Sequence, residues 1–297
     1  MIINAASLAA LRTGFQGLFQ EGLGSAPSQH ARIVTPVTST AKSERYGWLG
    51  QLPGVREWVG DRVVHSLAEH DYEIKNKSFE LTISVDRDDI SDDSVGVYAP
   101  MFREMGESTG AHDDQQVFSL LAAGFTTNCF DGQFFFDVDH PVLDAGGAST
   151  SISNFGGGAG TPWYLLCTKR AIKPLILQRR EPWKFVSLDD PTDENVFKRK
   201  EFVYGAEARL NVGFGFWQLA YASRQPLTAD NYAAARAAVM SLKGDYGRPL
   251  GLIPDLLIVP PSLEGAGKAI LTSAVGGAGE TNRWAGTSEL MVSPWLA

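Results

Sequence analysis

Two apolar segments near the start of the chain constrain its fold most, because neither can bury its own side chains. The first covers residues 5–22 and spaces its large apolar residues three and four positions apart, which predicts an amphipathic helix. This helix would present an apolar stripe formed by Leu8, Leu11, Phe15, Leu18 and Phe19. Residues 24–43 follow without a sustained period, which indicates an extended arm.

The second segment, residues 44–78, combines aromatic and charged side chains and is interrupted by glycines, which indicates a long hairpin. Its apolar residues would leave a larger exposed patch than a monomer usually carries: Trp48, Leu49, Leu52, Val55 and Trp58. The same segment carries charges that could form pairs: Arg56, Glu57, Asp61 and Arg62. Trp and Arg dominate the energetics of protein interfaces, so a second copy of the chain is the simplest cover for this patch.

Composition excludes several classes of protein. Of the 297 residues, 44% are hydrophobic and 20% charged, which is enough apolar material for a globular core. No apolar run is long enough to span a membrane, and the N-terminus lacks the pattern of a secretory signal. The net charge of −8 and the lack of a Lys/Arg block argue against wrapping of nucleic acid. The two cysteines exclude a disulfide framework.

The rest of the chain mixes strands and helices, which predicts an α+β protein. Alternation over 79–90 predicts a half-buried strand, and 93–124 predicts a long helix that starts at Asp92 or Asp93 and is kinked or split at Gly110. Residues 125–162 are rich in loops, with a mobile Gly/Ser run, and 163–223 predict several strands. Helices over 227–242 and 263–273 flank a short strand over 255–259, and the chain ends on a strand-like segment.

One cluster could carry chemistry. Asp137, Asp139 and His140 could place oxygen and imidazole ligands around one metal, as in a metal-dependent hydrolase. The alternative is a polar turn after a strand, and this is favoured because no further histidine motif supplies ligands. His112, Asp113 and Asp114 are assigned to a solvated helix face or a cap. No catalytic residue, metal ligand or cofactor is therefore predicted.

Several long segments, in order and over essentially the whole chain, resemble the major head subunit of Mu-like phages and prophages. They are YGWLGQLPGVREWVGDR, YEIKNKSFELTISVDRDDISDD, FDGQFFFDVDHP, VFKRKEFVYGAEARLNVGFGFWQLAYAS, LTADNYAAARAAV, GRPLGLIPDLLIVPPSLEGAGKAIL and ELMVSPWLA. The resemblance implies the Hong Kong 97 phage-type capsid fold. That fold has an N-terminal arm (1–43), an extended loop or E-loop (44–76), a peripheral or P-domain with a long spine helix (77–124 and 177–224), and an axial or A-domain (125–176 and 225–297).

The resemblance also implies a function. Members of this fold assemble as hexamers and pentamers into an icosahedral shell around double-stranded DNA, which lies close to the shell without specific recognition. A separate scaffolding protein, a portal and a decoration or minor capsid protein are the expected partners, and the virion, assembled in the bacterial cytoplasm, is the expected location. Some relatives form Lys–Asn crosslinks, but no matching motif surrounds Lys75, Asn76 and Lys77, so no crosslink is predicted.

Contacts between subunits are expected from two of these parts. The extended loop would cover a neighbour through Trp48, Leu49, Leu52, Arg56, Glu57, Trp58, Asp61 and Arg62, and the arm would dock Leu11, Phe15 and Leu18 on an adjacent subunit. Three alternatives stay open at this point: an encapsulin-like compartment shell, the metal-dependent hydrolase, and a tail or portal component that forms rings or tubes.

Overall fold

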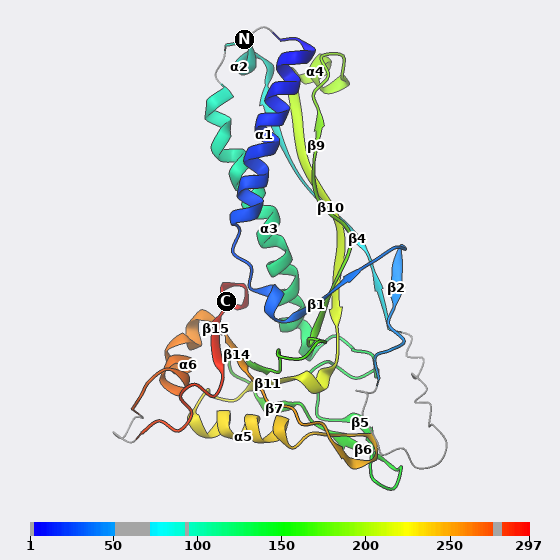
Figure 1. Ribbon diagram of the computed structural model, residues 1–297, viewed down its shortest axis with the longest axis vertical. Coiled ribbons are helices and arrows are strands. Elements are labelled where there is room, and N and C mark those ends of the chain that lie inside the picture. Colours follow the sequence, from blue (N-terminus) through cyan, green and yellow to red (C-terminus); the bar gives the residue numbers. More distant parts are fainter. Residues whose placement is uncertain (1–2, 51–71, 93–94, 276–280) are drawn as a thin grey trace.

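The computed structural model describes residues 3–50, 72–92, 95–275 and 281–297. The molecule is elongated, with a narrow upper lobe of two helices against long strands and a broader lower lobe (Figure 1). The described chain begins at the tip of the upper lobe, and the C-terminus lies where the two lobes meet. Among the described residues, no helix has the length and apolar character needed to cross a membrane.

A four-stranded sheet forms one side of the upper lobe, in the order β1 (Val34–Thr38), β9 (Leu175–Leu188), β10 (Glu201–Phe214), β4 (Lys77–Asp86). β10 pairs antiparallel with both of its neighbours, whereas β1 runs parallel to β9. The strand predicted over 79–90 is confirmed only to Asp86. There the Asp86 carboxylate accepts the amide of Asp88 at 2.7 Å and starts a short helix, α2 (Arg87–Ser91).

Two long helices pack side by side on this sheet: α1 (Ala5–Ser25) and α3 (Ala99–Ala122). Asn4 and Ser7 form a reciprocal capping box that fixes the start of α1. Glycines allow the helices to approach closely, since a Cβ on Gly22 would lie 2.0 Å from the Arg103 carbonyl oxygen. The predicted kink at Gly110 is wrong, because α3 is continuous and a Cβ on Gly110 would meet Ala26 at 2.4 Å. The predicted start at Asp92 is also wrong, because a 3-10 turn, η2 (Val95–Tyr98), precedes α3; Asp93, the other predicted start, lies outside the described residues.

The lower lobe contains a five-stranded sheet in the order β15 (Glu289–Val292), β14 (Leu256–Val259), β8 (Trp163–Leu166), β11 (Ala220–Arg224), β7 (Phe155–Gly158). β8 and β14 are buried throughout, as expected for apolar central strands. The helices α5 (Ala229–Met240) and α6 (Glu264–Leu271) pack beside this sheet, and α5 has the predicted Thr228 cap. β11 belongs to this sheet, although the sequence analysis places its residues in the segment 177–224 of the peripheral domain.

The glycine- and serine-rich run is ordered, contrary to the predicted mobile loop. Its first part contains β6 (Ser149–Ile152), which forms a hairpin with the preceding β5 (His140–Leu143), and its second part contains β7. Asn154 lies between them and is fully buried, with its side-chain amide bonded to the carbonyl of Phe135 at 2.8 Å. The remaining elements are β2 (Ser43–Arg45), β3 (Glu73–Lys75), α4 (Glu194–Arg199), β12 (Lys243–Gly244) and β13 (Arg248–Pro249).

Candidate assembly surfaces

The predicted hydrolase cluster is not assembled. Asp137 accepts backbone amides of its own turn through both carboxylate oxygens, from Phe134 at 3.2 Å and from Val138 at 2.7 Å. Asp139 is exposed, whereas His140 is fully buried and stacks on Trp217 with ring centroids 4.0 Å apart. The structural alternative is therefore correct for Asp137, and the three side chains do not share one site.

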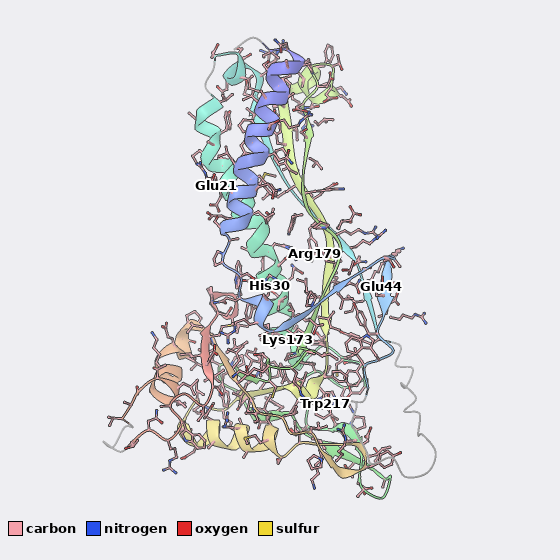
Figure 2. The ribbon with its side chains drawn as sticks, viewed as in Figure 1. Glu21, His30, Glu44, Lys173, Arg179 and Trp217 are labelled. Atoms are coloured by element: carbon pink, nitrogen blue, oxygen red, sulfur yellow. The ribbon has the colours of Figure 1, made fainter. Side chains whose placement is uncertain are left out.

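His140 instead lies beside two residues that the sequence analysis did not select. Its Nδ1 is 2.7 Å from an Asp131 carboxylate oxygen, and its Nε2 is 3.2 Å from the Asn154 side-chain oxygen. The Cys129 thiol donates to the other Asp131 oxygen at 3.0 Å. Figure 2 places Trp217 within the lower lobe, so this network lies inside the core below the long helices.

Cys129, Asp131 and His140 offer ligand atoms within 4.8 Å of one another, which is a spacing that could hold a metal ion. Burial, followed by the adjacent Asp131 carboxylate, raises the pKa of Cys129, so its thiol is protonated in the metal-free protein. Metals bind the thiolate. The three groups also satisfy one another by hydrogen bonding. We therefore interpret them as a buried hydrogen-bond network that stabilises the fold, and not as a metal centre.

The base of the extended loop is fixed to the upper sheet. β2 and β3 pair antiparallel, and the amide of Tyr46 donates to the carbonyl of Tyr72 at 2.9 Å. The Tyr46 hydroxyl donates to Gln178 at 2.7 Å, and Gln178 donates in turn to Asn76 at 2.8 Å. Asn76 is 7% exposed and also donates to Ser39 at 2.8 Å. This buried polar chain holds both ends of the loop in place.

Two residues of the predicted loop contact are anchored within their own chain. Leu49 is fully buried in the main core, and Trp48 packs on Phe216 with ring centroids 5.8 Å apart. The premise that Leu49 lacks an intrachain partner is therefore wrong, and it has no free surface for a neighbour. The other predicted residues lie outside the described residues: Leu52, Arg56, Glu57, Trp58, Asp61 and Arg62.

The arm helix also has a partner in its own chain. Phe15 is 4% exposed and stacks on Phe102 with centroids 4.0 Å apart, with Tyr204 edge-on at 5.1 Å. Phe15 therefore has little free surface for an adjacent subunit. Leu11 and Leu18 are only half-buried, and both line an apolar groove between α1 and η2.

After α1, the arm is tied to the long helix by Asp114. His30 Nδ1 lies 2.6 Å from the Asp114 carboxylate, which also accepts the backbone amides of Gln29 and His30 at 2.9 and 2.8 Å. His30 is seen beside the lower end of α3 in Figure 2. Asp113, its neighbour, pairs with Arg179. Both carboxylates are buried, so the predicted solvated face is wrong here.

Replacing Asp114 with Asn should lower the free energy of unfolding by about 2 kcal/mol at pH 7, since hydrogen bonds to a charged acceptor are lost. Burial alone would raise the pKa of Asp114, but the bonds from His30 and the two backbone amides outweigh it and lower the pKa. The stabilisation is therefore complete above the unfolded pKa of about 3.9 and lost as the pH falls through the folded pKa. Urea unfolding should show the difference between Asp114→Asn and the parent at pH 7 shrinking below about pH 4. A difference that is independent of pH would contradict this assignment.

The comparisons with known proteins cover the whole chain. Residues 8–296 match the family described as Mu-like prophage major head subunit gpT. The chain belongs to this family. It is 42% identical over 305 residues to the major capsid protein of Escherichia phage Mu, with both chains fully covered. It is also 43% identical over 270 residues to the Mu-like prophage FluMu major head subunit of Haemophilus influenzae, covering 88% of this chain and 87% of the relative.

Solved structures agree with this membership. The subunit of the bacteriophage JBD30 procapsid superposes with a TM-score of 0.87 at 43% identity, covering 99% of this chain and all of the other. The subunit of the JBD30 capsid gives a TM-score of 0.78 at 33% identity, with full coverage of both chains. The predicted Hong Kong 97-type capsid fold is confirmed, and this Mu-like head subunit is a phage major capsid protein and a component of the capsid.

Proposed function

We propose that copies of this chain form the hexamers and pentamers of a closed icosahedral shell around double-stranded DNA. The observation that carries this proposal is the likeness of the entire chain to the JBD30 procapsid subunit, at a TM-score of 0.87. Assembly would take place in the cytoplasm of the bacterial host. The net charge of −8 is compatible with DNA that is driven in by a motor, since an acidic lining would not trap it.

Each of the two lobes corresponds to one of the proposed domains of the subunit. The upper lobe, with α3 as its spine helix, would be the peripheral domain, and the lobe built on the five-stranded sheet would be the axial domain near capsomer centres. The extended loop would reach a neighbour with Trp58 as an apolar anchor and with Arg56, Glu57, Asp61 and Arg62 fixing the register. Leu11 and Leu18 are the arm residues proposed to contact an adjacent subunit, because they keep exposed apolar surface.

Other head proteins are proposed partners. A related JBD30 capsid is decorated with minor capsid protein trimers, which supports a similar decoration here. A separate scaffolding protein and a portal would complete the head. The role proposed for this chain is structural, as in its family, and requires no cofactor.

Negative-stain microscopy of the chain, expressed alone and with its neighbouring head genes, tests the proposal. We expect closed polyhedral shells, or hexameric and pentameric capsomers, in at least one sample. Open tubes or single rings would favour a tail or portal component instead, and a persistent monomer in both samples would contradict shell assembly.

A further inference from the structure

The apolar groove beside α1 has no occupant in the described part of the chain. It is a shallow groove of about 630 Å³ that is open to solvent, lined by α1 on one side and by Val95, Gly96 and Ala99 on the other. Leu11 and Leu18 contribute its apolar wall, and Gly14 leaves its floor open. Among the described lining residues only Ser7 is polar, and its hydroxyl is already used in the α1 capping box. The groove therefore suits an apolar side chain.

A matching apolar side chain lies on the same lobe. Phe197 is 89% exposed, more than any other large hydrophobic residue described. It lies on α4, between the two long strands, whereas its neighbour Val196 is 2% exposed and anchors α4 to the upper core. α4 and α2 lie next to each other at the tip of the upper lobe (Figure 1), where the Arg87 amide donates to the Lys200 carbonyl at 2.8 Å. A partner that covered this phenyl ring would gain free energy by removing its apolar surface from water.

The charges around the two features are complementary. Near the groove, α2 and the residue after it carry Asp88, Asp89 and Asp92. Asp88 pairs with Lys200 of its own chain at 3.6 Å, and Asp89 accepts the Tyr98 hydroxyl. Beside Phe197, α4 ends in Lys198 and Arg199. Lys198 pairs with Glu194 of its own helix, but Arg199 and Asp92 are exposed and make no ion pair within the described residues. Asp92, at the acidic rim of the groove, and Arg199, next to the exposed ring, therefore carry opposite charges that are free to pair between copies.

We propose that Phe197 of one copy packs into the α1–η2 groove of a neighbouring copy, with Arg199 beside that neighbour's acidic rim. The inference rests on the proposed function, because it needs neighbouring copies. The groove and Phe197 are different surfaces, so the contact is heterologous: each subunit offers its groove to one neighbour and its phenyl ring to another. Such a contact can close around a rotation axis.

Filling the groove tests the proposal without damaging the fold. A Cβ on Gly14 or on Gly17 would have no heavy atom within 4 Å, and only Gly14 lines the groove. Gly14→Met should keep or raise the unfolding temperature of the subunit, since glycine disfavours the helix interior. It should lower the fraction of subunits that sediment as shells at least tenfold, while Gly17→Met, the matched control, should assemble like the parent.

Crosslinking identifies the occupant. Shells of the double variant Gly14→Cys, Phe197→Cys, treated with a short bismaleimide, should give a ladder of covalent multimers. A mixture of the two single variants should stop at dimers, because each chain then has one reactive end. The native thiols do not interfere, as Cys129 and Cys167 are 5% and 2% exposed.

The outcomes separate this inference from the proposed function. Closed shells from Gly14→Met at the parental yield, with no crosslink in the double variant, would overturn the groove contact and leave shell assembly standing. A crosslink from Cys at position 14 to a different head protein would overturn the second copy as occupant. If the parent forms no shells in any sample, the proposed function fails and the groove contact falls with it.

Discussion

Shells should not close when residues 51–71 are replaced by a short Gly/Ser linker. The chain on either side of this segment is held together. Arg45 and Glu73 lie opposite each other in the antiparallel β2–β3 pair, and the Tyr46 amide donates to the Tyr72 carbonyl. The linker therefore leaves the anchored base intact, including Leu49 and the buried bonds of Gln178. We expect a folded subunit with the parental unfolding midpoint that stays as monomers or isolated capsomers in sedimentation.

Point variants in the intact loop distinguish the effect of losing a single contact from the effect of shortening the loop. Loss of an aromatic interface anchor costs about 2 kcal/mol per contact, close to a 30-fold weakening, so Trp58→Ala should raise the concentration needed for assembly. Charge reversal of Arg62 should change the salt dependence and rate of assembly more than its extent. Normal shells from the linker variant would contradict the proposed role of the extended loop.

His140→Ala should strongly destabilise the lower lobe. It removes a ring stacked on Trp217 and leaves the Asp131 carboxylate and the Asn154 oxygen short of partners. Breaking a buried pair in this way costs about 3–5 kcal/mol. Burial alone would raise the pKa of Asp131, but bonds from His140 and Cys129 outweigh it and lower that pKa. Without His140, the bonds that lower the pKa of Asp131 are fewer, so burial raises this pKa in the variant. Acid unfolding of the variant should therefore begin at higher pH than that of the parent.

The matched control for His140→Ala is Asp139→Ala. Asp139 is exposed and should change the free energy of unfolding by less than about 0.5 kcal/mol. Urea unfolding of dissociated subunits, with and without added zinc, measures both variants. If zinc raised the urea midpoint of the parent but not that of His140→Ala, the network would hold a metal. That result would contradict its interpretation as a stabilising hydrogen-bond network.

Local patterns predicted the regular elements well, because the signals lie within a few residues of each other. The α5 helix follows from the Thr228 cap and its alanines, and β14 follows from an apolar run that ends at Pro260. The gpT-family segments likewise predicted the fold, which the comparisons confirm. The glycine-rich run was misassigned because one buried side chain, Asn154, orders it through partners far along the chain.

The contact residues were harder to predict, since an apolar stripe does not show what covers it. Phe15 finds Phe102 and Tyr204, which lie many residues away, so a stripe that indicated a neighbouring subunit in fact packs on the same chain. The polar anchors were missed for the same reason. Gln178, at the end of an apolar strand segment, is the one sequence signal that could have shown a buried polar network at the loop base.

The sequence does not single out Phe197, because this residue lies within 163–223, where several strands are predicted. Its exposure becomes visible only once α4 separates β9 from β10 and Val196 takes the buried position. An aromatic residue between a polar turn and the basic run Lys198–Lys200 is a pattern that could be searched for in other head subunits.

Cryo-electron microscopy of particles formed with the neighbouring head proteins tests the central claim most directly. Closed shells in which this chain occupies both five-fold and six-fold capsomers are the predicted result. Particles that lack five-fold positions, or tubes built from the same subunit, would contradict the assignment of this Mu-like head subunit to an icosahedral shell.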